Sequence, residues 1–306
     1  VQTCALPILH QPTVAMTTKE VSDMVEKFIL AAVRVKKSGI DGVEVHGAHG
    51  YLVNQFLSPH TNHRTDKYGG SFENRLRFLE EIVIGIKERC GKDFPLVVRL
   101  SVDEFYETIG LPEEGLHLKD GVKIAERMEQ LGVDAIDVSS GTYETMNTAW
   151  EPSSFDQGWK INLAETIKKS VKIPVIGVSV IRDPEYADQI IADGKVDFVG
   201  SARQHFGDPE WSNKAKEGRT NEIRKCISCL HCMEVLMSSD ITKLPCQCAI
   251  NIQSGRELDY SNFIEDGDGR TVAIIGAGPA GLEAARVLAM RKFKRSEERR
   301  VGKEWD

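Results

Sequence analysis

Between residue 17 and about residue 220, the spacing of hydrophobic positions alternates between a helical period and a strand period. Thr17 and Glu20 form a capping-box pattern, and apolar residues then recur three and four positions apart, which predicts a helix ending near Gly39. Short runs rich in β-branched residues alternate with further helical patterns. We expect strands at 41–46, 95–100, 134–139, 173–178 and 196–201, and helices at about 72–88, 118–131, 162–170 and 184–192.

This alternation predicts an α/β fold with a parallel sheet. Polar residues recur just after the strands, which favours a TIM (β/α)8 barrel, whose chemistry lies at the strand C-termini, over a doubly wound open sheet. A complete barrel has eight strands and five are visible. We therefore expect residues 9–220 to form the C-terminal part of a barrel, about its last five βα units, with about three strands missing upstream.

Two further segments follow the expected barrel. Residues 221–254 are rich in cysteine, and a polar stretch rich in Gly and Asp comes next. Within 268–294 an apolar strand pattern runs into G-x-G-x-x-G and then into a helical pattern. This predicts the first βα unit of a Rossmann-like dinucleotide-binding domain, in which the three glycines allow a tight turn and a close approach of pyrophosphate. These glycines are Gly276, Gly278 and Gly281.

The two ends of the chain resemble translated sequencing-adapter sequences. Residues 1–8 and 295–306 show neither an apolar period nor a cap that continues their neighbours. We expect both segments to be foreign to the native protein, and the rest to be an internal piece of a longer one.

Composition narrows the class of protein. The 306 residues carry a net charge of −7, which gives no basic footprint for nucleic acid. No run of about 18 apolar residues predicts a membrane span. Five of the seven cysteines fall between Cys226 and Cys248, which indicates metal ligation in a reducing compartment rather than a disulfide framework. We expect a cytoplasmic protein acting on a small molecule, and the sequence does not indicate its oligomeric state.

The cysteine spacing predicts a metal site. Cys226, Cys229 and Cys232 follow each other at intervals of three, so their thiolates can share one tight turn. A fourth thiolate is available from Cys248 or Cys246. Four cysteines can hold an iron–sulfur cluster or a structural zinc ion, and the spacing alone does not choose between them.

A cluster of candidate catalytic residues follows the first expected strand. His46, His49 and Tyr51 lie within six positions of each other. Two imidazoles and a phenol at a strand end can converge on a carbonyl oxygen and a nearby carbon.

The run HGAHGYLVNQFLSPHTNHRTDKYGGSFENR that begins at His46 resembles the old yellow enzyme family. The similarity extends over about residues 11–291 and is nearest to the multidomain branch that includes 2,4-dienoyl-CoA reductase, bile-acid enone reductases and trimethylamine dehydrogenase. The resemblance implies that His46 and His49 bind the substrate carbonyl and that Tyr51 protonates the α-carbon, while reduced FMN reduces the β-carbon. It also implies that Arg99 lies against the flavin ring and stabilises the reduced anion.

The resemblance places the FMN phosphate at the loops after the last two strands. The first of these loops contains Gly177 and Ser179, and the second contains Ala202 and Arg203. Arg203 matches the family pattern. Ser179 and Ala202 stand where glycine is usual, which limits how closely the backbone can approach a phosphate.

The resemblance further implies a chain of cofactors. Electrons would pass from NAD(P)H through FAD and a 4Fe-4S cluster to FMN, and then to an α,β-unsaturated carbonyl. The cluster ligands would be Cys226, Cys229, Cys232 and Cys248, with Cys246 as the alternative fourth ligand. The glycines of the second domain would bind FAD, or ADP as in the amine dehydrogenases.

Two other functions remain open from the sequence. An amine dehydrogenase on the same scaffold is favoured by the cysteine spacing, whereas the pair His46 and His49 with Tyr51 favours carbonyl reduction. The third possibility is a non-catalytic zinc-binding protein or an inactive fragment. We expect the 306-residue chain by itself to be inactive and its full-length parent to be an enzyme.

Overall fold

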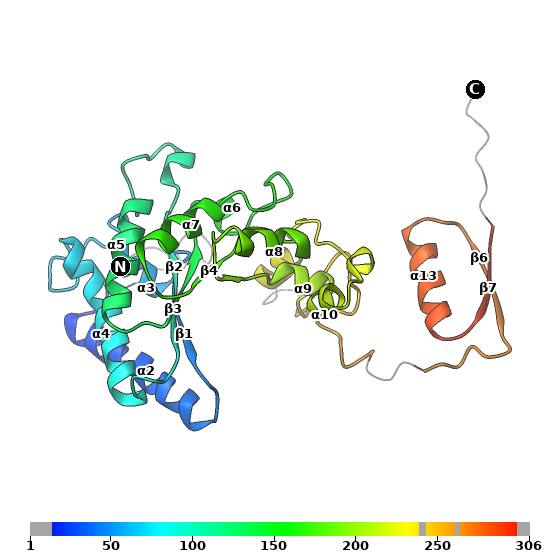
Figure 1. The fold of residues 1–306 in the computed structure, drawn as a ribbon, viewed down its shortest axis with the longest axis horizontal. Coiled ribbons are helices and arrows are strands. Elements are labelled where there is room, and N and C mark those ends of the chain that lie inside the picture. Colours follow the sequence, from blue (N-terminus) through cyan, green and yellow to red (C-terminus); the bar gives the residue numbers. More distant parts are fainter. Residues whose placement is uncertain (1–13, 239–242, 261–263, 299–306) are drawn as a thin grey trace. The chain divides into compact units, whose positions relative to one another are not determined.

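The computed structural model describes residues 14–238, 243–260 and 264–298 (Figure 1). The chain divides into two compact units, residues 1–234 and 235–306, which are described separately. The expected adapter segment 1–8 and residues 299–306 lie outside the described part of the chain.

The first unit is built on a parallel sheet. Its strands are β1 (Val43–Gly47), β2 (Leu96–Ser101), β3 (Ala135–Ser139), β4 (Val175–Gly177) and β5 (Phe198–Val199). They are hydrogen-bonded in the order β1-β2-β3-β4-β5. A doubly wound sheet reverses its strand order at a switch point, and these strands show no reversal. The sheet is therefore that of consecutive βα units, as in part of a TIM barrel, and the predicted α/β class with a parallel sheet is confirmed.

Helices follow the strands in the predicted alternation. The longer ones are α2 (Thr18–Lys37), α4 (Phe72–Cys90), α5 (Leu118–Gln130), α7 (Ile161–Ser170) and α8 (Pro184–Ala192). The shorter ones are α3 (Leu52–Leu57), η1 (Tyr106–Ile109), α6 (Met146–Ala149), α9 (Arg203–Gly207), α10 (Trp211–Lys216), η2 (Thr220–Glu222) and α11 (His231–Met237). The predicted capping box of Thr17 and Glu20 is present at the start of α2.

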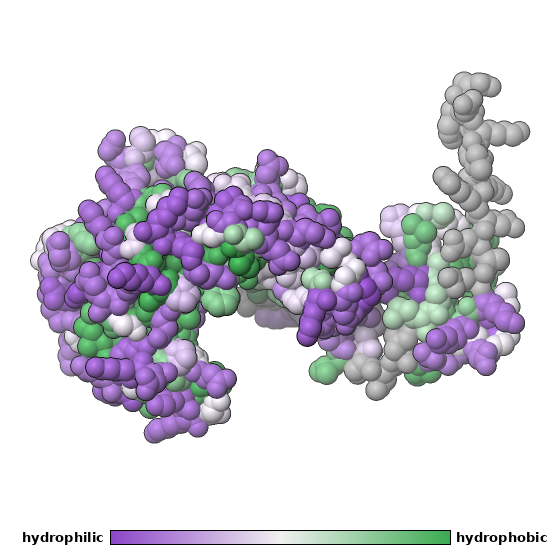
Figure 2. Space-filling view, in the orientation of Figure 1, coloured by the Kyte–Doolittle hydropathy of each residue, from purple (hydrophilic) through white to green (hydrophobic). Residues whose placement is uncertain are grey.

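Alternate strand residues face the helices and form the core. Val45, Val98, Ile136 and Val175 are each at most 4% exposed, within a cluster that includes apolar residues of α2, α4, α5 and α7. Their neighbours in the strands point to the opposite face. Figure 2 shows a hollow in the first unit that is bordered by the end of α2 and the segment leading to β1.

The second face carries charged and polar residues in one row. The strand register aligns His46 of β1 with Arg99 of β2, and Arg99 with Asp137 of β3. Because parallel strands share one direction, this row lies close to the carboxyl edge of the sheet. His46 and Arg99, which the sequence analysis singled out, therefore lie side by side, with Asp137 next to Arg99.

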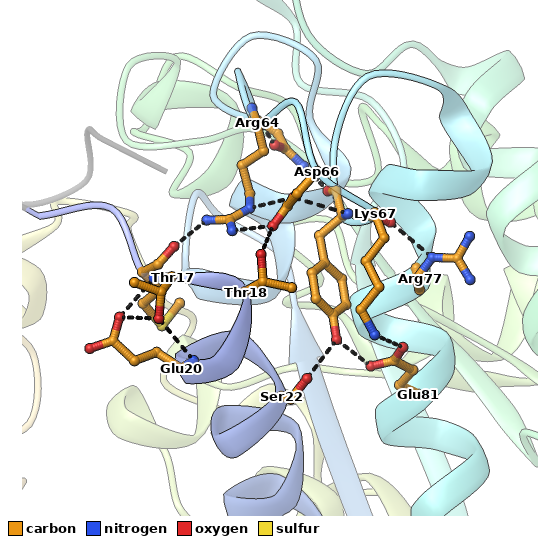
Figure 3. A network of polar contacts seen from close by, with 12 residues as sticks. Thr17, Thr18, Glu20, Ser22, Arg64, Asp66, Lys67, Arg77 and Glu81 are labelled. Carbon is orange, nitrogen blue, oxygen red and sulfur yellow. Dashed lines mark hydrogen bonds and ion pairs between the residues drawn. The ribbon is translucent and has the colours of Figure 1, made fainter.

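The loop after β1 is anchored to two outer helices by a polar network (Figure 3). Asp66 accepts hydrogen bonds from Arg64 Nε, at 3.0 Å, and from Thr18 Oγ1 in the first turn of α2, at 2.5 Å. The hydroxyl of Tyr68 donates to Glu81 of α4 at 2.7 Å. The long segment between β1 and α4 is thereby held in a defined position beside the candidate site.

The second unit contains a short parallel βαβ arrangement. Strand β6 (Thr271–Ile275) is followed by α13 (Pro279–Met290) and then by β7 (Lys294–Glu298), which pairs with β6. The sequence pattern predicted β6 and α13. Strand β7 falls in the segment that resembles an adapter, where no element was expected. No helix in the described ranges combines the length and apolar character needed to cross a bilayer.

Candidate active site

The three candidate catalytic residues lie together at the end of β1. The ring centroids of His46 and His49 are 5.2 Å apart, and those of His46 and Tyr51 are 5.1 Å apart. His49 and Gly50 have φ values of 61° and 75°, so the chain reverses sharply after the strand. This reversal brings His49 and Tyr51 back beside His46.

His49 is held firmly by two serines from neighbouring strands. Its backbone N–H donates to Ser101 Oγ at 2.9 Å, and its Nε2 lies 2.7 Å from Ser139 Oγ. The side chain is 7% exposed. Burial, helped by the charge of Arg99, lowers the pKa of His49 to about 2. His49 is therefore neutral at neutral pH and a poor proton acceptor.

His46 shares this electrostatic environment. Burial and then the charge of Arg99 lower its pKa below the usual value. A neutral imidazole has one N–H, so each histidine can donate one hydrogen bond without carrying a charge. Tyr51 is 41% exposed, and its phenol lies at the rim of the pair.

Arg99 presents an unsatisfied donor on the same face. Its Nε lies 3.3 Å from Asp137 Oδ2, yet Arg99 Nε and Asp137 Oδ1 are buried without a hydrogen-bond partner. A buried polar group without a partner is costly, so its presence suggests a bound ligand. A guanidinium donor beside the histidines fits the edge of an anionic reduced flavin, and the residues present therefore fit FMN.

The first of the two loops expected to hold the FMN phosphate is tightly packed. Ser179 is 2% exposed, and its Oγ accepts from the backbone N–H of Lys160 at 3.0 Å. The Ser179 hydroxyl can still donate its own proton to a phosphate. A Cβ on Gly177 would lie 2.6 Å from Val196 Cγ1, so Gly177 is required for packing.

Val180 is a residue of this loop that the sequence reasoning missed. Its φ of 53° lies in the left-handed region, which β-branched residues rarely adopt. The strain at Val180 indicates a backbone shape that normally belongs to glycine.

Arg203 of the second phosphate loop takes part in a buried ion network. Its Nη1 donates to the Glu151 carbonyl at 2.7 Å and its Nη2 to Glu151 Oε2 at 2.6 Å. The second carboxylate oxygen of Glu151 lies 2.7 Å from Lys160 Nζ, and both Glu151 and Lys160 are 3% exposed. The guanidinium of Arg203 is thus paired with Glu151 in this structure, and its contact with the FMN phosphate stays a prediction. Ala202 directly precedes helix α9.

A row of aromatic rings extends the site outward. The Tyr51 ring lies 5.3 Å from that of Tyr143, and the Tyr143 ring lies 6.3 Å from that of Trp150, both in edge-on arrangements. Tyr143 and Trp150 belong to the loop after β3 and are partly buried. This row could not be predicted from the sequence, since Tyr51 is far from Tyr143 and Trp150 in the chain.

The three cysteines of the first unit follow one another along the segment that leads into α11. Ser228 and Leu230 have left-handed backbone conformations, and the N–H of Ser228 donates to Cys226 Sγ at 3.4 Å. Cys229 is exposed, and Cys232 lies in the first turn of α11. In the described residues, no three His, Cys, Asp or Glu side chains are grouped as metal ligands. Cys246 and Cys248 belong to the second unit, so the full ligand set stays a prediction.

The glycines of the second unit occupy the turn between β6 and α13. Gly276 has a φ of 105°, and Gly278 is the N-cap of α13. A Cβ on Gly281 would lie 1.9 Å from the Gly276 carbonyl oxygen, so only glycine allows this contact between helix and turn. Binding of pyrophosphate at this turn stays a prediction from the glycine pattern.

Comparison with known proteins identifies relatives along nearly the whole chain. The sequence pattern of the NADH:flavin oxidoreductase / NADH oxidase family matches residues 6–222. The chain is 50% identical over 277 residues to a protein named NADH oxidase from Thermoanaerobacter brockii, covering 90% of this chain and 41% of that protein.

Two solved structures resemble the chain closely. A 2-naphthoyl-CoA reductase complex has a TM-score of 0.84 and 33% identity, covering 92% of this chain and 42% of the other. Histamine dehydrogenase from Rhizobium sp. 4-9 has a TM-score of 0.81 and 33% identity, covering 93% of this chain and 40% of the other. The chain thus spans about two fifths of the length of the proteins that it matches.

Proposed function

Because the chain belongs to the NADH:flavin oxidoreductase / NADH oxidase family, we propose that it forms part of a reductase for the C=C bond of α,β-unsaturated carbonyl compounds. The substrate would be an enone or an enoyl thioester. The observation that carries this proposal is the ring contact of His46 with both His49 and Tyr51.

The proposed roles follow from the electrostatics of the three side chains. His46 and His49, both neutral, would each donate an N–H to the substrate carbonyl oxygen and stabilise the negative charge that develops there. The Tyr51 phenol would supply a proton to the α-carbon. FMN, when bound beside Arg99, would supply the reducing equivalents.

The remaining cofactors are proposed from the sequence pattern. Cys226, Cys229, Cys232 and Cys248, or Cys246 in place of Cys248, would hold a 4Fe-4S cluster. The amide contact from Ser228 to Cys226 supports this, because hydrogen bonds to sulfur stabilise cluster thiolates. The turn containing Gly276 and Gly281 would hold the adenine nucleotide of FAD, and NAD(P)H would be the electron donor.

The same scaffold also suits amine oxidation, as the likeness to histamine dehydrogenase suggests. Two observations favour the reductase. His49 is a poor base because of its lowered pKa. Arg99 and Lys160, which pair with Asp137 and Glu151, both act on His49 with positive charge, and positive charge stabilises a developing enolate.

The test uses the full-length protein, purified without oxygen. We expect NAD(P)H-dependent reduction of an enone or enoyl thioester, and a loss of about 100-fold or more in kcat for Tyr51→Phe. A wild-type protein that oxidises histamine or dimethylamine, and leaves enones and enoyl thioesters unreduced, would overturn the reductase proposal.

A second measurement tests the cluster. We expect about four iron atoms and about four acid-labile sulfides per chain, which is the content of one 4Fe-4S cluster. Zinc without sulfide would replace the cluster by a structural zinc site. Cys248→Ala and Cys246→Ala, compared side by side, would identify the fourth ligand by the loss of iron.

A further inference from the structure

A carboxylate outside the proposed site is completely buried near the turn that carries His49 and Tyr51. Glu104, in the loop after β2, is 0% exposed. Its Oε1 accepts from Asn54 Nδ2 at 2.9 Å, and its Oε2 accepts from Ser58 Oγ and from the backbone N–H of Leu116, each at 2.7 Å. All three partners are neutral donors.

Asn54 transmits this contact to the candidate catalytic residues. Its Oδ1 accepts from the backbone N–H of Gly50 at 2.7 Å, and Gln55 Nε2 donates to the Gly50 carbonyl at 2.8 Å. Gly50 lies between His49 and Tyr51, where the chain reverses. A continuous path of hydrogen bonds therefore runs from Glu104 through Asn54 to the peptide that joins the two side chains.

The burial of Glu104 is costly. Removal from water raises the pKa of its carboxyl to about 7, against the effect of its three hydrogen bonds. A buried carboxylate paired with neutral donors contributes less to stability than apolar packing of the same volume would. The three hydrogen bonds, by contrast, fix the carboxylate and the Asn54 side chain in one geometry.

We propose that Glu104 is a positioning residue, which fixes the turn at Gly50 and thereby sets the placement of Tyr51 relative to His49. This inference rests on the proposed function, in which Tyr51 is the proton donor. The placement of the turn can nevertheless be measured without any reaction.

Exchanging the carboxylate of residue 104 and the amide of residue 54 tests this proposal. In Glu104→Gln, the remaining oxygen can serve Ser58 and Leu116, which leaves the new NH2 group facing the NH2 group of Asn54. In the double variant Glu104→Gln with Asn54→Asp, the NH2 of residue 104 donates to residue 54, whose other oxygen still accepts from Gly50. The double variant thus restores every hydrogen bond of the path.

The first readout is amide hydrogen exchange in the 306-residue chain, followed in peptides covering residues 46–58. We expect exchange to rise on the order of tenfold in Glu104→Gln and to return to the wild-type rate in the double variant. The exposed Glu113 in the same loop gives a matched control, Glu113→Gln, which should leave exchange unchanged. Wild-type exchange in Glu104→Gln would overturn the inference, whatever the protein's activity.

The second readout is the kinetics of the full-length enzyme. We expect Glu104→Gln to lower kcat by about 10- to 100-fold with little change in KM, and the double variant to recover most of the loss. In a Tyr51→Phe background the same change should have little further effect, because the group being positioned is absent. Equal losses in both backgrounds would overturn the positioning role. Absence of reductase activity in the wild type would remove the proposed function, and hydrogen exchange would then decide the inference about the turn.

Discussion

The Nε2 atom of His49 lies 2.7 Å from the Oγ atom of Ser139, although 90 positions separate the two residues in the chain. For His49 to donate a hydrogen bond to a carbonyl oxygen through Nδ1, its Nε2 must accept from Ser139. The serine at the end of β3 would therefore select the tautomer of a histidine in the loop after β1.

Replacing this serine should impair the reaction without removing a catalytic group. We expect Ser139→Ala to lower kcat/KM by about 10-fold, because His49 can then adopt either tautomer and its ring is less constrained. The exposed Ser153 provides the control variant Ser153→Ala. A steady-state rate for Ser139→Ala equal to that of the control would contradict the tautomer role.

Two buried groups should give the protein's stability opposite dependences on pH. The pKa of His49 is lowered from 6.5 to about 2, so between these values the unfolded chain binds a proton that the folded chain does not, and stability falls as the pH falls. The pKa of Glu104 is raised from 4.5 to about 7, so between these values the folded chain binds the extra proton, and stability rises as the pH falls. From about pH 4.5 to 6.5 the two contributions cancel.

Replacing one of the two groups should expose the effect of the other on the pH dependence of stability. Relative to wild type, His49→Gln should gain stability as the pH falls from 6.5 to 4.5, and Glu104→Gln should lose it, each by about 1.4 kcal/mol per pH unit. Other titrating groups cancel in these differences. Urea unfolding at several pH values gives the free energy of unfolding of each protein. If this free energy depends on pH in the same way in the wild type and in both variants, the shifted pKa values of His49 and Glu104 are refuted.

The strained loop residue offers a stabilising change. We expect Val180→Gly to stabilise the fold by about 1 kcal/mol, since the relief of left-handed strain exceeds the entropy that glycine loses on folding. It should also tighten FMN binding, because the backbone could approach a phosphate more closely. Val178→Gly, at a position without a positive φ, should destabilise the fold instead. Thermal unfolding and flavin titration separate these outcomes.

The aromatic row predicts a preference among substrates. Tyr143 lies 5.3 Å from Tyr51 in ring contact, so an aromatic substituent on the substrate can stack beside the proposed proton donor. We expect Tyr143→Ala to raise KM for an aryl-substituted substrate by about 5- to 10-fold and to leave KM for an alkyl-substituted one nearly unchanged. Equal changes for both substrates would argue against an aromatic subsite.

Local sequence signals predicted the elements whose ends are set by short-range chemistry. The capping box at Thr17 and the left-handed Gly39 bracket α2, and both are present in the structure. Helix α3 was missed, because it has six residues and no side-chain cap, and it buries the polar Asn54 and Gln55. Its Asn54 donates a hydrogen bond to Glu104, which is 50 residues away in the chain, and such a contact leaves no periodic pattern in the sequence.

The candidate site was predicted in its parts rather than in its connections. His46, His49 and Tyr51 are close in sequence, so their convergence followed from a strand end and a turn. The partners that orient them, such as Ser139 and Glu104, come from other βα units. Such contacts arise only when parallel strands are placed side by side, and a single sequence carries no spacing that reveals them.

The buried network of Lys160, Glu151 and Arg203 constrains how this scaffold can recombine. Glu151 lies in the loop after β3, and Arg203 follows β5, so a chimera with a crossover between them inherits its buried charges from two different parents. If the second parent lacks the arginine, the buried Glu151 keeps its ion pair with Lys160 but loses the one with Arg203. Exchange of residues 151–203 as one block keeps the three charges together, so chimeras of this scaffold should take this segment from a single parent.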